Sequence, residues 1–546
     1  MTSESRSAET VAACSMCGRP TAIDLLDEAR SWRFRERPDG ACPACVQEAL
    51  LQTLLENGDA ALHAAVQTCW PLDAEAAFGA LPTPLRMHSD PRYLGRGRTI
   101  ALIDSGFHPH PDLVKPANRI HAWVDAGRDE VVAIRFAADD QPRWPGWDAG
   151  EGHQWHGTMT SVSAAGNGFL GHGLYRGLAS EAGVVLIAAR QPDGRITNAS
   201  IERALRWLVD NGEALGVTVA SLSVAGDEVA GAARTGIDRH IDCLVARGVA
   251  VVCAAGNDGV RRLVPPATCP AALTVGGIDD ANNLDHRDLA IWHSNYGEAA
   301  DGGSKPELVA PSLWLAAPVL PGTAVAREAA ALFAIRRSGD RSVDRRIDEL
   351  KLISPHYQHV DGTSFAAPIV ASIAACMQEA NPSISARLVR ELLIRSAHPV
   401  PGAPRERQGA GAVEAGRAVA LAAGEAHATT SVSPTADAEG TRFFLHDHRA
   451  RRVRVCGSWN GWNATLEAGN DGAGFWVAGP VRLSAGTHAY KYIIDDDTWI
   501  DDPLNAQKTP DGLGGLNSVV TTKGGRASPD RDAEAVLAGS GAANRR

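Results

Sequence analysis

Five short apolar runs, separated by stretches with helical spacing, characterise the middle of the chain. The segments Ile201–Asn211 and Gly236–Arg247 place apolar residues three and four positions apart, as does Ser364–Glu379 further along. Apolar strands that alternate with helices are typical of a parallel sheet covered by helices on both faces. We therefore predict an α/β domain over residues 91–425. Its predicted buried strands are Thr99–Ile103, Val184–Ala188, Val217–Ser221, Val249–Ala254 and Leu273–Val275.

Polar residues stand at the ends of three of these predicted strands. Asp104 and Asn257 come just after their strands, and Ser221 is the last residue of its strand. In a parallel sheet, ligands bind beyond the carboxyl ends of the strands. We therefore expect the functional site at this edge of the sheet.

The stretch Asp361–Pro368 predicts a tight turn that opens a buried helix. Gly362 permits a backbone conformation that other residues disfavour, and Phe365–Met377 is almost entirely apolar or small. Ser364 then lies near a helix N-terminus, where unpaired N–H groups and the helix dipole favour developing negative charge. A serine in this position is a candidate nucleophile if a base and an orienting carboxylate exist elsewhere.

Two upstream stretches supply these partners. Asp104 ends a predicted strand, and His156 lies in Trp155–Thr158, which we predict to be a loop entering a helix. The order Asp, His, Ser is one of the known chain orders of the serine-protease triad. Together, four motifs resemble those of the subtilisin-like serine peptidases, the subtilase family. They are Asp104-Ser105-Gly106, His156-Gly157-Thr158, Ala254-Ala255-Gly256-Asn257 and Gly362-Thr363-Ser364-Phe365-Ala366-Ala367-Pro368.

The resemblance runs from about Gly95 to about Ala423 and implies a subtilisin-like serine endopeptidase acting on protein or peptide substrates. It implies that Ser364 attacks the carbonyl, that His156 transfers the proton, and that Asp104 orients the imidazole. Asn257 then donates its amide to the oxyanion. A Rossmann-like domain with coincidental polar residues is the weaker alternative for the fold. A catalytically silent glucan- or protein-binding scaffold is the alternative for the function, and the complete triad favours the enzyme.

The same resemblance implies two groups of substrate-binding residues. The first group binds substrate backbone as an added strand, and the second walls the S1 pocket. Where the family usually has glycines after the leucine, this chain has Ser223 and Val224. Val264 falls near the pocket base, where a branched side chain disfavours large aromatics, and Asp258 falls near the rim, where an acid favours basic residues. The two groups are Ser221, Leu222 and Ser223, and Ala254, Ala255 and Gly256.

Asp112, in His110-Pro111-Asp112-Leu113, matches a calcium ligand of some subtilases. The rest of that calcium loop has no recognisable counterpart in this chain. Calcium therefore enters the prediction as an optional cofactor held in part by Asp112.

The N-terminal segment, residues 1–45, contains two Cys-x-x-Cys pairs, Cys14 with Cys17 and Cys42 with Cys45. Paired knuckles of this kind let four thiolates reach one tetrahedral zinc, with no position left open for chemistry. We therefore predict a structural zinc site in a zinc-ribbon-like segment. Two disulfides or four unligated thiols are the alternatives, and a reducing compartment weakens the first.

Two further segments of the protease region have open interpretations. Residues 46–90 show helical spacing and are predicted to be a helical linker, with docking on the protease as the alternative. Thr323–His356 is longer than the usual connection and contains two helical stretches, Ala326–Arg337 and Asp344–Leu352, with many arginines. We interpret it as a surface insertion, with a lid or an exosite for acidic substrates as the alternative.

The composition changes after the α/β domain. Residues 426–440 are rich in Thr, Ser and Ala and are predicted to be a linker, and residues 524–546 a disordered tail. Between them, residues 441–523 alternate apolar and polar positions, as in Gly486–Ile494, and predict an all-β sandwich. A turn at Gly457–Asn463 carries two tryptophans.

This last module resembles the family 48 carbohydrate-binding modules, which include the glycogen-binding module of AMP-activated kinase beta subunits. The resemblance implies a site for a glycogen- or starch-like glucan, in which aromatic rings stack on sugar faces. Docking to a protein, with the tryptophans packed inside the sandwich, is the alternative. The site residues implied are Trp462, Lys491, Trp499 and Asn517, within a motif set that includes Gly457, Trp462-Asn463, Tyr490-Lys491-Tyr492, Asp502-Pro503 and Asn517.

Composition and charge limit the partners. A net charge of −11 over 546 residues argues against nucleic acid or an acidic membrane as the main partner. No run is long and apolar enough to span a bilayer. The stretch Met1–Arg6 lacks the basic region and apolar core of a secretory signal, so we expect a cytoplasmic protein.

Overall fold

The computed structural model divides into two compact units, Met1–Ala426 and His427–Arg546, and each is described by itself. The structure describes residues 11–13, 20–22, 43–57, 61, 62, 65, 80–148, 152–228, 234–284, 289–424, 433–436, 440–446, 450–462, 466–470, 475–502, 505, 507–513 and 515–522.

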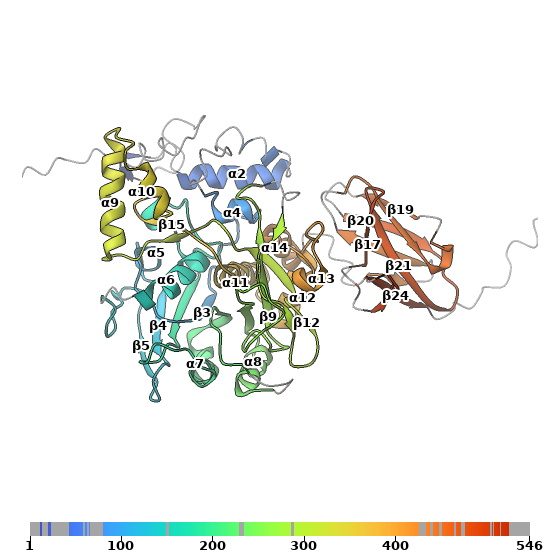
Figure 1. Ribbon diagram of the computed structural model, residues 1–546, viewed down its shortest axis with the longest axis horizontal. Coiled ribbons are helices and arrows are strands. Elements are labelled where there is room, and N and C mark those ends of the chain that lie inside the picture. Colours follow the sequence, from blue (N-terminus) through green and yellow to red (C-terminus); the bar gives the residue numbers. More distant parts are fainter. Residues whose placement is uncertain are drawn as a thin grey trace, which may run out of the picture. The chain divides into compact units, whose positions relative to one another are not determined.

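A largely parallel sheet forms the centre of the first unit (Figure 1). The strand order is β10-β9-β8-β7-β3-β6-β4-β5, and β13 pairs with β9. All pairings are parallel except β4 with β5 and β9 with β10. The strands are β3 (Thr99–Asp104), β4 (Ile120–Asp125), β5 (Val132–Arg135), β6 (Gly183–Ala188), β7 (Val217–Leu222), β8 (Ala250–Ala254), β9 (Leu273–Asp279), β10 (Ala290–Ile291) and β13 (Leu308–Pro311).

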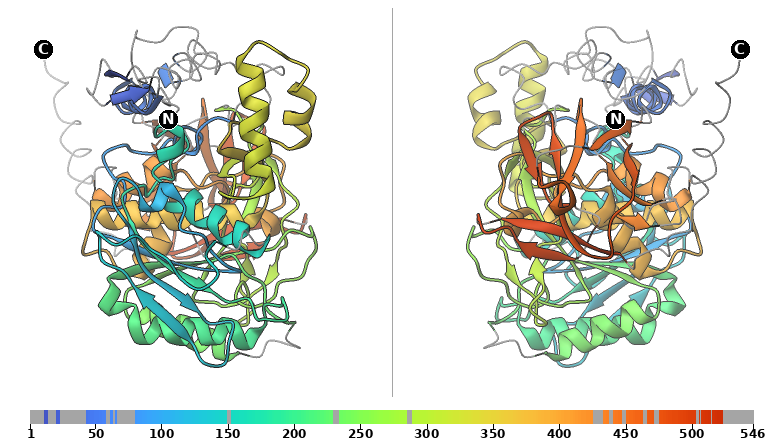
Figure 2. Two further views of the ribbon diagram at one scale, coloured as in Figure 1. Left: turned by 90° about the vertical axis from the view of Figure 1, so that its left-hand side faces the viewer. Right: turned by 90° about the vertical axis from the view of Figure 1, so that its right-hand side faces the viewer.

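Helices cover both faces of this sheet because successive strand residues point to opposite sides. In β3, Ile100 and Leu102 belong to a core shared with α6 and α11, whereas Ala101 and Ile103 pack with α7 and α8. Figure 2 shows α7 and α8 as green helices below the sheet. The helices are α6 (Gly152–Ala165), α7 (Asn198–Asn211), α8 (Gly236–Ala246), α11 (Thr363–Ala380), α12 (Ala386–Ser396) and α14 (Ala415–Ala423).

The five predicted strands and three predicted core helices are all present, with ends that differ by a few residues. The sequence predicted a loop entering a helix at Trp155–Thr158, but α6 begins earlier, at Gly152, and His156 lies inside it. Strands β4, β5 and β13 were not predicted. The remaining short elements of this unit are α4 (Thr83–Arg86), α5 (Pro111–Val114), α13 (Arg405–Gln408), β11 (Gly297–Glu298), β12 (Ser304–Lys305), β14 (Leu315–Pro318) and β15 (Tyr357–Val360).

The helix α2 (Pro43–Asn57) packs against the protease region rather than acting as a spacer. Leu50 and Leu51 are buried in one cluster with Tyr175 and Tyr357. Further along the same segment, Arg86 donates to both carboxylate oxygens of Asp280, at 2.8 and 2.6 Å. The described part of residues 46–90 therefore packs on the protease region, which favours the docking alternative over a linker. A short hairpin, β1 (Val11–Ala13) with β2 (Pro20–Ala22), precedes it.

The insertion folds into two helices, α9 (Ala324–Arg337) and α10 (Asp344–Glu349). Its arginines form ion pairs with acids of the same insertion: Arg346 with Glu328 at 2.7 Å, Arg336 with Asp344 at 2.9 Å, and Arg345 with Glu349 at 3.0 Å. These ion pairs offset part of the basic charge of the insertion, which favours the surface insertion over an exosite for acidic substrates.

The second unit is all-β and antiparallel, in the order β16-β17-β20-β19-β18-β21-β24-β23, with β22 on β21. Phe443, Val455, Trp476, Tyr490 and Tyr492 are central residues of its core. The strands are β16 (Thr435–Ala436), β17 (Thr441–His446), β18 (Val453–Gly457), β19 (Leu466–Asn470), β20 (Phe475–Val481), β21 (Gly486–Ile494), β22 (Thr498–Ile500), β23 (Lys508–Pro510) and β24 (Leu516–Thr522).

Candidate active site

The predicted base and its orienting carboxylate are joined by a short hydrogen bond. Asp104 is the last residue of β3, and His156 lies one turn inside α6. His156 Nδ1 is 2.7 Å from Asp104 Oδ1. The Asp104 side chain is 1% exposed and that of His156 is 24% exposed, so the imidazole is open to the cleft while the carboxylate is covered.

The electrostatic surroundings suit His156 to accept a proton. Burial lowers the pKa of the imidazole, but the charge of Asp104 and its hydrogen bond together outweigh burial and raise this pKa above its ordinary value of 6.5. Asp104 therefore stabilises the positively charged form of the His156 imidazole.

The predicted nucleophile lies at the start of α11. Gly362, the residue before this helix, has φ of 135°, a conformation that side chains disfavour. Ser364 then sits in the first helical turn, where backbone N–H groups have no acceptor within the helix. The ring of the next residue, Phe365, lies 5.9 Å from the His156 ring, centre to centre. His156, Asn257 and Ser364 all line one cleft of about 580 Å³.

Asn257, the predicted oxyanion donor, is fixed in place by hydrogen bonds to its side-chain amide oxygen. Asn257 Oδ1 accepts from Thr363 N at 3.0 Å and from Thr363 Oγ1 at 2.8 Å. Thr363 Oγ1 accepts in turn from Gly256 N at 3.0 Å. Because the amide oxygen is engaged, the amide nitrogen is left as the group available to an oxyanion. A Cβ on Gly362 would lie 3.4 Å from that nitrogen, so a side chain there would crowd it.

The predicted substrate strand is only partly at the cleft. Ser221 and Leu222 belong to β7 and are paired in register with β3 and β8. Ser223, the first residue after the strand, lines the cleft and donates its hydroxyl to Ser364 O at 2.8 Å. Ser223 thus connects the end of β7 to the turn that carries Ser364. Ser221 and Leu222 lie within the strand and are not among the residues that line the cleft.

The predicted S1 residues Ala254, Ala255 and Gly256 line the same cleft, together with Val224 and Val264. The two valines narrow it with branched apolar side chains. Asp258, the acid at the rim of the cleft, has a basic neighbour.

Arg262 lies 3.9 Å from Asp258 and 3.4 Å from Glu228. One arginine therefore offsets part of the charge of two acids, which weakens the expectation that Asp258 selects basic residues.

The candidate calcium ligand Asp112 is fully buried, and both of its carboxylate oxygens accept hydrogen bonds from the protein. Tyr357 Oη donates to one at 2.6 Å and Leu170 N to the other at 3.0 Å. Its near neighbours include His110, with Nδ1 3.8 Å away. A calcium site needs several unengaged oxygens, so these residues do not fit a calcium ion, although calcium is common in subtilases.

Of the predicted zinc ligands, Cys14, Cys17 and Cys42 lie outside the described residues. Cys45 is described and lies, half-buried, in the first turns of α2. Within the described ranges, no cluster of three or more His, Cys, Asp or Glu residues is placed to hold a metal ion.

The tryptophans of the second unit divide between core and surface. Trp459 stacks on Phe443 at 5.3 Å and belongs to the core. Trp462 and Trp499 lie 6.5 Å apart, and Trp499 is 47% exposed, so these two indoles form an aromatic surface. The proposal that the tryptophans only pack the sandwich therefore fails for this pair.

The other predicted sugar ligands lie on adjacent strands. Lys491 donates to Asp511 at 2.7 Å and is mostly buried, so its amine is already partly neutralised. Asn517 is on β24, opposite Thr509. Asp511, the partner of Lys491, also accepts a hydrogen bond at Oδ1 from the backbone N–H of Leu513. The Leu513 side chain is 92% exposed. The exposure of Leu513 was not predicted, because a lone leucine in a Gly-rich turn has no periodic pattern around it.

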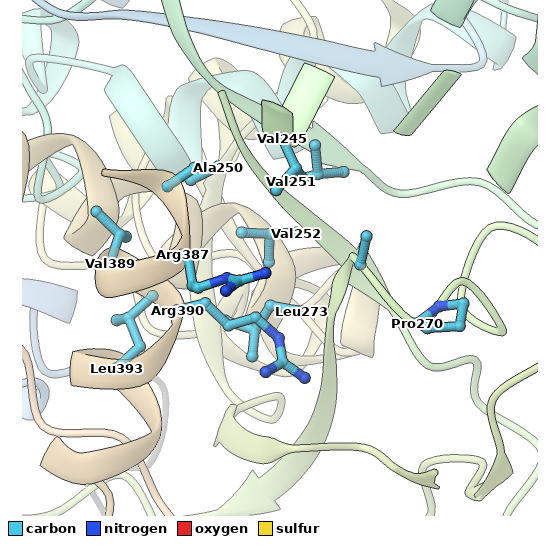
Figure 3. Close-up of a pocket in the computed structure, with 12 residues that line it drawn as sticks. Val245, Ala250, Val251, Val252, Pro270, Leu273, Arg387, Val389, Arg390 and Leu393 are labelled. Carbon is cyan, nitrogen blue, oxygen red and sulfur yellow. The ribbon is translucent and has the colours of Figure 1, made fainter. Parts of the chain in front are cut away.

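A second cavity lies at the opposite edge of the sheet, at the amino ends of β8 and β9 (Figure 3). It has a volume of about 210 Å³ and is mostly apolar, with Arg387 and Arg390 of α12 extending across it. Arg390 is paired with Glu307 at 2.6 Å. None of the predicted catalytic residues lines this cavity. Within the described ranges, no helix combines the length and apolar character needed to cross a bilayer.

Comparison with known proteins supports the assignment of both units. A model of the subtilase family matches residues 95–411. A second model, the glycogen recognition site of AMP-activated protein kinase, matches residues 441–525.

The serine protease AprX of Bacillus subtilis (strain 168) is 27% identical over 334 residues, which are 60% of this chain and 66% of AprX. Subtilisin BL of Lederbergia lenta is 27% identical over 303 residues, 56% of this chain and 84% of that protein. Among solved structures, the prenylagaramide maturation protease PagA gives a TM-score of 0.42 at 20% identity, over 62% of this chain and 96% of that one.

The match to AprX thus spans slightly less than two thirds of that relative's length. The subtilase model, by contrast, matches more than half of the present chain. The chain therefore belongs to the subtilase family of serine-type endopeptidases.

Proposed function

We propose that this protein hydrolyses peptide bonds in protein or peptide substrates through Asp104, His156 and Ser364. The observation that carries the proposal is the 2.7 Å bond from His156 to the buried Asp104, in a cleft that His156 shares with Ser364. A silent scaffold would have no need to keep an imidazole exposed on one side and bonded to a buried carboxylate on the other.

The chemistry follows from these positions. Ser364 Oγ bonds to the substrate carbonyl carbon while His156 takes its proton, and the oxyanion is met by the Asn257 amide and the Ser364 N–H. His156 then gives the proton to the leaving amine as the C–N bond breaks, leaving an acyl-enzyme. Water attacks the ester, His156 takes the water's proton, and it returns a proton to Ser364 as the C–O bond breaks.

Labelling with a fluorophosphonate tests the proposal directly. The full chain should be labelled and lose peptidase activity, whereas Ser364→Ala should not be labelled. Ser342→Ala, at an exposed serine of the insertion, is the matched control and should label as the wild type does. Natively folded wild-type protein that stays unlabelled would support the silent scaffold instead.

We infer that the substrate residue before the cleaved bond is a small or medium aliphatic one. Val224 and Val264 line the cleft with branched side chains, and Arg262 offsets part of the negative charge of the two acids at its rim. One methylene in such a pocket is worth about 1–3 kcal/mol of discrimination. A peptide library with aromatic or basic residues preferred at this position would contradict the inference.

We propose that the C-terminal module binds an α-linked glucan such as glycogen or amylopectin, and so directs the peptidase to it. The family match and the paired indoles Trp462 and Trp499 support this. Aromatic rings in this arrangement stack on the apolar faces of sugars.

Migration in native gels with and without glycogen tests it. The full chain carrying Ser364→Ala should be retarded by the polysaccharide, and adding Trp462→Ala with Trp499→Ala should remove the effect. Trp155→Ala, at a tryptophan of the first unit that is 42% exposed, is the control for losing a surface indole. Equal mobility of the parent protein in both gels would leave protein docking as the role of the module.

We also propose a structural zinc held by Cys14, Cys17, Cys42 and Cys45. The Cys-x-x-Cys spacing of the two pairs supports it. One zinc per chain should co-purify under reducing conditions without chelator, and Cys45→Ser should lower this amount. Metal-free wild-type protein would rule it out.

We propose an intracellular setting on the basis of the cysteines. Cys243, Cys253, Cys269, Cys376 and Cys456 form no disulfides in the structure, which is typical of reducing compartments. Fractionation of producing cells should place the protein with the cytoplasmic markers. Recovery in the medium would contradict this.

A further inference from the structure

Helix α6 directs two side chains at the same buried carboxylate. His156 and Thr160 are four positions apart and therefore lie on one face of the helix. His156 Nδ1 lies 2.7 Å from Asp104 Oδ1, and Thr160 Oγ1 donates to Asp104 Oδ2 at 2.8 Å. Thr160 is 1% exposed, so water does not compete for this bond.

The hydroxyl of Thr160 has one hydrogen and two acceptors in reach. The other acceptor, Gly157 O, is 3.1 Å away and neutral. A carboxylate at shorter distance forms the stronger bond, so the hydrogen belongs to Asp104.

The donors divide unevenly between the two oxygens of Asp104. Oδ1 lies 2.7 Å from His156 Nδ1 and accepts from Ser105 N at 2.6 Å. Ser105 Oγ is 3.1 Å from the same oxygen but has a nearer acceptor, His153 O, at 2.8 Å. Among the contacts of the described residues, Thr160 is the donor that holds Oδ2.

We propose that Thr160 is a positioning residue for catalysis, which fixes the plane of the Asp104 carboxylate so that Oδ1 faces His156. The proposal rests on the proposed peptidase function. The hydroxyl acts through Asp104 and touches neither the substrate nor Ser364.

Loss of this hydroxyl has two consequences. The carboxylate plane becomes free to turn away from the imidazole, which disturbs the tautomer and orientation needed for proton transfer. The carboxylate also loses a donor that disperses its charge, so it attracts a positive imidazolium more strongly. The first effect lowers kcat, and the second makes His156 harder to deprotonate.

The test compares Thr160→Val, which keeps the shape of the side chain, with Thr160→Ser, which keeps the hydroxyl. Ser161→Ala is the control, because Ser161 is buried on the same helix but donates only to the helix carbonyl of Thr158. In Thr160→Val, kcat should fall about tenfold, equivalent to about 1.4 kcal/mol, and the acid limb of kcat/KM should move to higher pH. Thr160→Ser should restore both, and Ser161→Ala should change neither.

A second measurement does not depend on turnover. In a Ser364→Ala background, the titration of His156 followed by NMR should move to higher pH on adding Thr160→Val. An unchanged titration together with wild-type kcat would overturn the role of Thr160. A shifted titration in a protein whose wild-type form lacks peptidase activity would instead contradict the proposed function and leave the Thr160 contact intact.

Discussion

The Tyr357 hydroxyl donates to a carboxylate oxygen of Asp112 at 2.6 Å, inside the protein. Tyr357 begins β15, the strand that leads into the nucleophile turn, and Asp112 lies on α5, in the segment that follows Asp104. Both side chains are at most 1% exposed. This bond therefore connects the two chain segments that carry the proposed catalytic residues Asp104 and Ser364, at a position where the sequence offered an optional calcium ligand.

We predict that calcium removal leaves this protein unchanged, because Asp112 is already satisfied by Tyr357 and Leu170. Peptidase activity and the thermal midpoint should agree in EGTA and in millimolar calcium. Tyr357→Phe, by contrast, should cost about 1–3 kcal/mol of stability, because it leaves a buried carboxylate oxygen without a donor. A midpoint that falls in EGTA for the wild type would show that calcium binds after all.

The periodicity of the chain predicted the sheet well because its strands are buried on both faces. Runs such as Val184–Ala188 are then apolar throughout, and strand ends place Asp104 and Asn257 at one edge. The triad followed from motif order rather than from distance. The order of the motifs led us to expect a contact between Asp104 and His156, but the sequence alone does not give the hydrogen bond that joins them.

What the sequence could not predict depends on element boundaries and on burial. The contact from Thr160 to Asp104 requires that the chain be helical from His156 to Thr160, whereas the sequence predicted a loop at Trp155–Thr158. Ser221 and Leu222 were expected at the cleft, but β7 extends to Leu222, so both residues are buried within the sheet. The different roles of Trp459 and Trp462 depend on which indole reaches the core, which a motif does not encode.

The pH dependence of catalysis should reflect the raised pKa of His156. The imidazole must be neutral to accept the proton of Ser364, so kcat/KM should fall as the pH drops through a value above 6.5. Asp104→Asn removes the charge that raises this pKa and leaves burial, which lowers it. In that variant the acid limb should move to lower pH while kcat falls by about 10⁴.

The measurement is kcat/KM for one peptide across the pH range in both proteins. Asp258→Asn, at an exposed rim acid, is the control for removing a negative charge from the cleft. An acid limb below 6.5 in the wild type would contradict the raised pKa.

The width of the cleft gives a prediction about Val264. Replacing it with glycine removes a branched side chain from the predicted base of the S1 pocket and opens space for larger side chains. In Val264→Gly, kcat/KM for peptides with phenylalanine at the position before the cleaved bond should rise at least about tenfold relative to those with alanine. Val260→Gly is the control, because Val260 is nearby in sequence but 42% exposed. Unchanged relative rates would place the base of the pocket elsewhere.

Phe365 directly follows the proposed nucleophile Ser364, at a position where many subtilases carry methionine. Its ring is 2% exposed and lies 5.9 Å from the His156 ring. A methionine there would place its sulfur close to the catalytic groups, and oxidation to the sulfoxide would add a polar oxygen beside the oxyanion site. Phenylalanine cannot undergo that change. Met159, on the helix of His156, is 2% exposed within the apolar core and does not belong to the cleft lining.

We therefore predict that the wild type keeps its peptidase activity in mild peroxide better than Phe365→Met does. Residual activity should be measured for both proteins over a series of peroxide concentrations, with mass spectrometry to locate each added oxygen. Met159→Leu in the wild-type chain is the control, and it should not alter the peroxide response because Met159 is shielded. If the two proteins lose activity in parallel, the sensitive group lies outside position 365. Oxygen found on Met159 would then identify it, and oxygen found on a cysteine such as Cys253, just before Ala254 of the cleft, would identify that thiol.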